Sequence, residues 1–184
     1  MTQLAQIDPA VRVAAATGGT WVQHHRDDGL LLQAPADWLV AARSASDFSV
    51  REPSGIAAAM VRGREVPLDS DLADWLWLRY PHTEPGLHQV RMRRIENLPA
   101  QAACAVFDYG SPIAPGRASA LAVRHGRRAT VFVAAALQSR HAHWLPLLLR
   151  VLDSSQPCPG GITPAARRAL LARLLRLSAE PCDP

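Results

Sequence analysis

The sequence predicts a single α/β domain of the α+β kind, made of many short strands and a few helices. Its 184 residues are 48% hydrophobic, which is enough for one packed core. Most of the chain consists of short segments that are either apolar or alternate between apolar and polar residues. Turn residues separate these segments, and this pattern is typical of strands. Two later segments, 139–152 and 163–177, carry apolar residues at helical spacing instead.

Turn residues set the limits of the expected strands. Asp-Asp-Gly at 27–29 and His-Gly at 125–126 are hairpin signals, and Pro-Ser-Gly at 53–55 is a further turn. The segment 129–137 is apolar on both faces, which predicts a central strand that is covered on both sides. The expected strands are 20–25, 30–33, 48–52, 56–62, 87–95, 102–109, 118–124 and 129–137, with a short apolar segment at 38–42.

Three helices are expected. Asp69 or Ser70 is predicted to cap the first, which has its apolar stripe at 72, 75 and 76 and is stopped by Pro81. The second spans 139–152, with Pro146 in its first two turns. Thr163 caps the third, Pro164 is its first residue, and its leucine stripe is opposed by Arg167, Arg168, Arg173 and Arg176. This helix either packs on the domain or offers a partner its apolar face.

The domain organisation follows from these elements. Residues 1–19 are an N-terminal arm, 20–155 are the domain, and 156–184 are a linker and the amphipathic helix. No apolar run reaches the roughly 18 residues that a bilayer span needs. The first residues lack the charged and apolar regions of a secretory signal, so a cytoplasmic location is expected.

Composition argues against nucleic-acid binding. All 20 basic residues are Arg, the net charge is +4, and the arginines are scattered between acidic residues. The chain has only three Phe and two Tyr residues. None of them lies in the mixed pattern of aromatic and basic residues that RNA-binding proteins use. We therefore expect no nucleic-acid partner.

Catalytic and metal-binding patterns are weak. Three widely spaced cysteines without a Cys-x-x-Cys pair predict neither a disulfide framework nor a zinc site, and Cys104 lies in an apolar stretch. There is no Gly-x-Ser-x-Gly elbow and no Gly-rich loop before a helix. We expect no catalytic residue, metal or cofactor. The alternative is a metal-dependent hydrolase using His24, His25, Asp27 and Asp28, although neighbouring strand histidines point to opposite faces.

Seven residues are candidates for partner binding. Trp75 and Trp77 cannot share a helical face, because two residues turn a helix by about 200°. We therefore expect Trp77, with Tyr80 three residues later, to face away from the core. Gln89, Arg91 and Arg93 share one face of the strand 87–95 and would line an uncovered side of the sheet. Leu171 and Leu174, from the last helix, complete the set.

Three local features resemble the PsbP-like group. They are GLLLQAPADW at 29–38, FSVREPSG at 48–55, and the strand 129–136 followed by a helix with Trp144 that ends in VLDS. The group includes the photosystem II protein PsbP, bacterial DcrB-type domains and the Eag chaperones of type VI secretion. The resemblance covers 20–155 and implies a sandwich with a central antiparallel sheet, no catalytic residues, and binding of proteins or hydrophobic segments. The helix 163–177 lies beyond the part that matches.

These observations favour a non-enzymatic, bacterial protein-binding domain. The most concrete interpretation is an adaptor or chaperone for a secreted, type VI-like effector with apolar helices. Binding would use an apolar area on a sheet face, with arginines around it giving orientation. Besides the hydrolase, a second alternative is a structural subunit. In that case the last helix would complete a homo-oligomer or a larger assembly.

Overall fold

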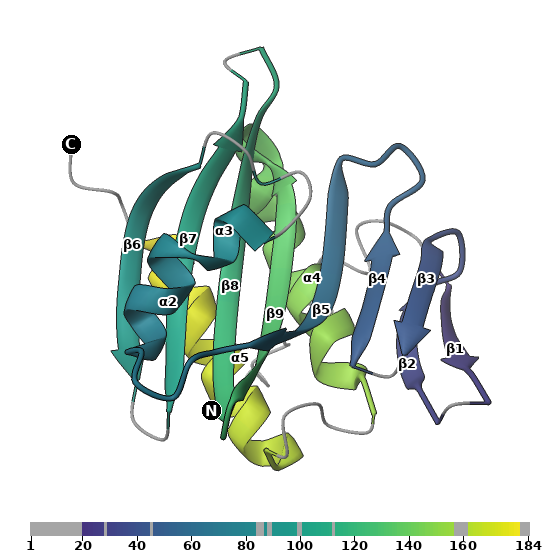
Figure 1. The fold of residues 1–184 in the computed structure, drawn as a ribbon. Coiled ribbons are helices and arrows are strands. Elements are labelled where there is room, and N and C mark those ends of the chain that lie inside the picture. The colour runs from purple at the N-terminus through teal and green to yellow at the C-terminus, as the bar shows by residue number, and fades with distance from the viewer. Residues whose placement is uncertain are drawn as a thin grey trace, which may run out of the picture.

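The strands that the structure describes form a seven-stranded antiparallel sheet and a two-stranded hairpin (Figure 1). The computed structural model describes residues 20–27, 29–44, 46–83, 87, 90–98, 101–111, 113–156 and 162–180. The hairpin consists of β1 (Trp21–His25) and β2 (Leu31–Pro35). The sheet has the order β3-β4-β5-β9-β8-β7-β6. Its strands are β3 (Leu39–Ser44), β4 (Asp47–Arg51), β5 (Ala57–Glu65), β6 (Arg91–Leu98), β7 (Ala102–Gly110), β8 (Pro115–His125) and β9 (Arg128–Leu137).

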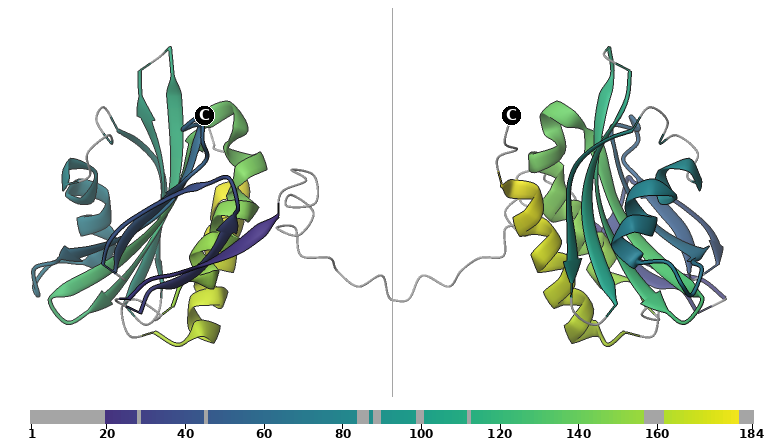
Figure 2. Two further views of the ribbon diagram at one scale, coloured as in Figure 1. Left: turned by 90° about the vertical axis from the view of Figure 1, so that its right-hand side faces the viewer. Right: turned by 60° about the vertical axis from the view of Figure 1, so that its left-hand side comes forward.

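Helices lie on both faces of this sheet (Figure 2). On one face, α2 (Leu72–Leu78) packs on β6, β7 and β8, and the short α3 (Tyr80–Thr83) follows it. On the other face, α4 (His141–Ser154) packs on β5 and β9, and α5 (Pro164–Ala179) packs on β7 and β8. A 3-10 turn, η1 (Gln138–Arg140), joins β9 to α4. The predicted α+β class, with helices flanking an antiparallel sheet, is confirmed.

Strand β9 lies at the centre of the sheet and is buried on both faces. Phe132 and Ala134 contact the core under α4, while Val131 and Val133 contact the core under α2. The prediction of a doubly covered central strand is therefore correct. Two strand starts differ from expectation by three residues or more: β6 begins at Arg91 instead of 87, and β8 begins at Pro115 instead of 118.

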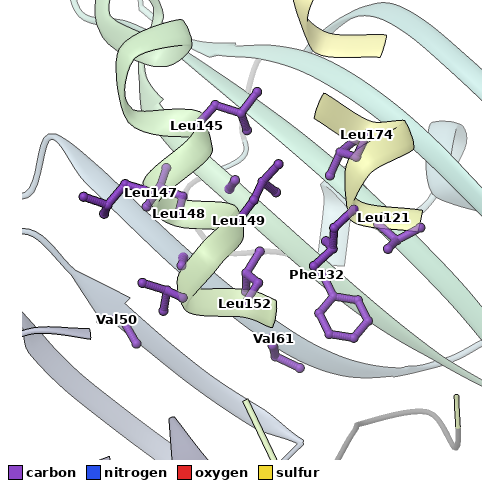
Figure 3. Close-up of a cluster of buried hydrophobic side chains, with 14 of the residues drawn as sticks. Val50, Val61, Leu121, Phe132, Leu145, Leu147, Leu148, Leu149, Leu152 and Leu174 are labelled. Carbon is purple, nitrogen blue, oxygen red and sulfur yellow. The ribbon is translucent and has the colours of Figure 1, made fainter. Parts of the chain in front are cut away.

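The larger core lies between the sheet and α4 (Figure 3). Leucines along α4 point onto β5, β8 and β9, where they meet Val61, Leu121 and Phe132. Leu174 from α5 joins the same cluster and is fully buried. Leu171 is buried beside it. These two leucines are therefore core residues and do not form an exposed apolar face for a partner, because α5 packs on the domain.

The caps of α5 were predicted correctly, but one of its arginines was not. Thr163 Oγ1 accepts a hydrogen bond from Ala166 N at 3.2 Å, and Pro164 is the first helical residue. Arg167, expected on the outer face, is only 2% exposed, because it lies four and seven residues before Leu171 and Leu174 on one helical face. Its guanidinium donates to the Ser155 and Asp153 carbonyls, which ties α5 to the end of α4.

Helix α2 begins and ends at different residues than expected. Asp71, not Asp69 or Ser70, is the cap, and its Oδ1 accepts hydrogen bonds from the backbone N–H groups of Ala73 and Asp74. The helix ends at Leu78, before Pro81. Pro81 lies inside α3, which starts a new turn at Tyr80.

Candidate functional site

Half of the sheet carries no helix on the face where α2 lies. In the described part of the chain, α2 and α3 stand over β6, β7 and β8, and the neighbouring β5, β4 and β3 are bare on that side (Figure 1). The reason lies in the alternation of the strands. Phe48 and Val50 of β4 enter the core under α4, whereas Ser49 and Arg51 point to the opposite face. A face with so many charged side chains offers a helix little apolar surface to pack against.

The bare face forms an open depression of about 450 Å³, which we call the arginine face. Small side chains make its floor and guanidinium groups surround them. The lining residues are Ala41, Ala42, Arg43, Asp47, Ser49, Arg51, Met60, Arg62 and Arg64. A second depression of about 420 Å³ adjoins it, shares Asp47 and Arg64, and extends toward His125 and Arg128.

The carboxylate of Asp47 forms ion pairs with two of the four arginines. Arg62 Nη1 donates to Asp47 Oδ1 at 2.9 Å and to the Phe48 carbonyl at 2.8 Å. Arg64 Nη1 lies 4.0 Å from Asp47 Oδ2. Arg43 and Arg51 are exposed and form no ion pair within the described residues. The face therefore carries an excess of positive charge, and two of its guanidinium groups are free to bind an anion.

Arg91 and Arg93, two of the three residues predicted on the strand 87–95, do not lie on this face. Helices cover both sides of the β6 half, so the expected uncovered side is absent there (Figure 2). Arg91 is exposed on the edge strand β6. Arg93 Nε lies 2.7 Å from Asp108 Oδ2, and Asp108 Oδ1 accepts from Arg117 Nε at 2.8 Å. Gln89 lies outside the described residues.

The expectation that Trp77 and Tyr80 face away from the core is correct for Trp77 and wrong for Tyr80. Trp77 is 44% exposed and Leu78, next to it, is also exposed. Tyr80 is fully buried, with its ring 5.8 Å from Trp75 and 6.5 Å from Phe107. The helix breaks between Leu78 and Tyr80, so the three-residue spacing no longer keeps Tyr80 on the face of Trp77.

The metal alternative gains no support from the geometry. His24 is half-buried and the neighbouring His25 is exposed, as expected for adjacent strand residues. Asp28 lies outside the described residues. Within the described ranges, no three His, Cys, Asp or Glu side chains come close enough together to hold a metal ion.

Two groups with catalytic potential are buried in the core. Burial, together with the nearby charge of Glu96, raises the pKa of Cys104 to about 12, so its thiol stays protonated at neutral pH. Ser119 Oγ lies 3.2 Å from His141 Nε2 and 2.7 Å from Ser178 Oγ. Burial and the charge of Arg117 lower the pKa of His141 to about 4. This Ser–His pair is closed to a substrate, because Ser119 is fully buried.

Sequence reasoning missed the arginine face, although a signal for it existed. The alternation of Ser49 and Arg51 with Phe48 and Val50 indicates a polar strand face. Arg62 and Arg64 have the same two-residue spacing. Only the pairing of β4 with β5 shows that these two patterns lie on the same side of the sheet.

Comparisons with known proteins bear on the architecture. No family model matches the chain, and no curated protein matches it. Similar solved structures include the cyanobacterial PsbP protein CyanoP from Synechocystis sp. PCC 6803, with 15% identity, a TM-score of 0.48, and 75% of this chain and 92% of that chain covered. The PsbP group is the one named by the sequence resemblance.

Two further solved structures resemble the chain more distantly. LpqN of Mycobacterium tuberculosis, involved in cell envelope biogenesis, has 13% identity and a TM-score of 0.43, with 74% of this chain and 89% of that chain covered. A protein from Bacteroides thetaiotaomicron VPI-5482 has 10% identity and a TM-score of 0.36, with 75% of this chain and 48% of that chain covered. Among the described helices, none has both the length and the apolar composition of a membrane span.

Proposed function

We propose that this chain is a non-enzymatic binding domain that holds an acidic segment of a partner protein on the arginine face. The observation that carries the proposal is the group of four guanidiniums around a floor of small side chains. Asp47 pairs with only part of this charge. Opposite charges on a partner would steer it to this face and fix its orientation.

The shape of the face fits an extended chain segment. Its depression lies along three neighbouring strands, so an extended segment could follow it from one strand to the next. Leu39 and Ala41 share the outward side of β3 with Arg43, because Val40 and Ala42 turn to the core. An extended segment with acidic and small apolar residues in alternation would match this arrangement.

More specifically, we propose that the chain is a cytoplasmic adaptor or chaperone for a secreted partner. An adaptor needs a surface that is open before the partner arrives, and the arginine face is such a surface. The sequence predicts an apolar area on a sheet face with arginines around it, and we propose the arginine face on β3–β5 for that role in place of β6. The proposal does not use Trp77, Leu171 or Leu174.

A defined peptide tests the proposal directly. The probe is a fluorescein-labelled peptide of alternating Glu and Val, compared with its Lys and Val counterpart by fluorescence anisotropy. We expect saturable binding of the acidic peptide alone, weakened as salt rises because the contact is electrostatic. The double variant Arg43→Glu with Arg51→Glu is expected to lose at least tenfold in affinity, about 1.4 kcal/mol.

A second double variant controls for overall charge. Arg140→Glu with Arg176→Glu changes the net charge by the same amount at exposed positions outside the arginine face. It should bind the acidic peptide as the unchanged protein does. Equal losses in both double variants, or equal binding of the acidic and basic peptides, would overturn the proposal.

A further inference from the structure

A further pocket lies away from the arginine face, where the turn after β2 meets the first half of α4. Its volume is about 450 Å³. We call it the tryptophan pocket, because Trp38 and Trp144 line it, together with Pro35, Leu147, Asp37 and Glu52. None of the described residues that line it is basic. The pocket is thus aromatic and acidic, the opposite of the arginine face.

The two indoles form a fixed corner. Their ring centroids are 5.7 Å apart and their planes are inclined by 57°. Trp38 is only 6% exposed and Leu147 is buried in the core under α4, so the wall belongs to the packed part of the fold. His143 adds an edge-on contact to Trp144, with centroids 5.4 Å apart. A ligand would meet a pocket that is already formed.

The carboxylates give the pocket a negative charge. Glu52 Oε2 accepts hydrogen bonds from Ser54 N at 2.9 Å and from Ser54 Oγ. Burial alone would raise the pKa of Glu52, but these bonds and those of the following backbone lower it below its ordinary value. Asp37 is exposed and forms no ion pair within the described part of the chain.

Aromatic faces and carboxylates together select cations. A cation within about 6 Å of an indole centroid is attracted by the negative face of the ring, and methylated ammonium groups also gain apolar contact. The same chemistry already occurs nearby, where the guanidinium of Arg150 lies 4.0 Å from the ring centroid of Trp21. We propose that the tryptophan pocket binds an organic ammonium ion, such as a trimethylammonium group, against the accessible part of Trp144 and beside the carboxylates of Asp37 and Glu52.

Choline and its neutral analogue 3,3-dimethylbutanol are the probes, because they share a shape and differ in charge. Binding is followed in the full chain by the indole N–H signals in NMR spectra. We expect choline to shift the signals of Trp38 and Trp144 saturably, and the neutral analogue to bind at least tenfold more weakly. Equal affinity for both compounds, or no saturable shift with choline up to about 100 mM, would overturn the proposal.

Neutral variants of the carboxylates locate the site without removing a buried ring. Glu52→Gln retains an acceptor for the Ser54 bonds, and Asp37→Asn lies at an exposed turn. Each is expected to weaken choline binding about threefold to tenfold. Asp69→Asn, an exposed carboxylate outside the pocket, should leave it unchanged. Unchanged affinity in both pocket variants would also contradict the proposal.

A separate experiment tests whether the ammonium group belongs to a lipid headgroup or to a soluble molecule. Sedimentation with phosphatidylcholine vesicles, compared with phosphatidylglycerol vesicles, identifies a lipid headgroup. Binding of free choline without binding to either vesicle identifies a soluble ligand. Both results support ammonium recognition, and neither depends on the acidic-peptide experiment, since the two surfaces share no lining residue.

Discussion

The two halves of the large sheet differ in how many of their faces are covered. Strands β7, β8 and β9 lie between α2 on one side and α4 and α5 on the other, and nearly all of their central residues are buried. Strands β3 and β4 alternate between buried and accessible residues. The same sheet thus has a half that is covered on both faces and a half that has one accessible face.

The difference teaches where a substitution affects stability and where it affects binding. In the covered half, a side chain is surrounded on all sides, so removing atoms leaves a cavity or an unpaired polar group. On the arginine face, a side chain can change with little effect on packing. The following predictions separate these two effects, from the largest expected change to the smallest.

Leu174→Ala removes a fully buried side chain from the core under α4. We expect the free energy of unfolding to fall by roughly 4 kcal/mol, because the remaining atoms cannot fill the cavity. Leu39→Ala, on the accessible side of β3, is the matched control, with an expected change under about 0.5 kcal/mol. Urea denaturation measures both. Similar losses for the two variants would show that α5 is not packed as described.

His141 makes the covered half sensitive to acid. Burial, and then the charge of Arg117, lower its pKa to about 4 from an ordinary value of 6.5, while the Ala134 carbonyl and Asp108 oppose the shift. Between these values the unfolded chain binds a proton that the folded chain does not, so stability falls as the pH falls. The total loss below pH 4 is about 3 kcal/mol.

His141→Gln tests the contribution of His141 to the pH dependence of stability. An amide retains hydrogen bonding but does not titrate between pH 4 and 6.5. We expect the free energy of unfolding of the variant to fall less steeply than that of the unchanged protein between pH 6.5 and 4. Carboxylates titrate in both proteins, so the difference between the two curves isolates the imidazole. Parallel curves would contradict the assignment.

Arg167→Met removes the guanidinium that joins α5 to the end of α4. The carbonyls of Asp153 and Ser155 would lose their buried donor, and we expect a loss of about 2 kcal/mol. Arg168→Met is the control, since Arg168 is exposed and its contact with Asp153 is worth under about 1 kcal/mol. Thermal unfolding at pH 7 distinguishes the two. A larger loss in the Arg168 variant would reverse the proposed roles.

The sequence predicted what depends on local chemistry. Thr163 and Pro164 mark the start of α5 because the cap and the first residue act within one turn. The central place of β9 followed from its apolar residues on both faces. These features need no knowledge of the neighbouring elements.

The cap of α2 was misplaced within its own turn, but several other failed predictions depended on a neighbouring element. Tyr80 belongs to a new helix, so the phase of α2 does not reach it. Arg167 is buried because the end of α4 supplies carbonyl acceptors, and an isolated helix shows no such partner. Arg91 and Arg93 were placed on an open face, but the position of α2 over β6 decides which half of the sheet is covered.

The β6 edge of the large sheet has a consequence for association between copies of the chain. Strand β6 ends the large sheet, and an exposed strand edge can pair with another molecule. Here the register with β7 shifts between Met92 and Arg94, and Arg91 stands exposed at the start of the strand. A second molecule aligned along this edge would meet an interrupted hydrogen-bond ladder and would have to strip water from a guanidinium. The β6 edge thereby opposes pairing with a strand of a second copy.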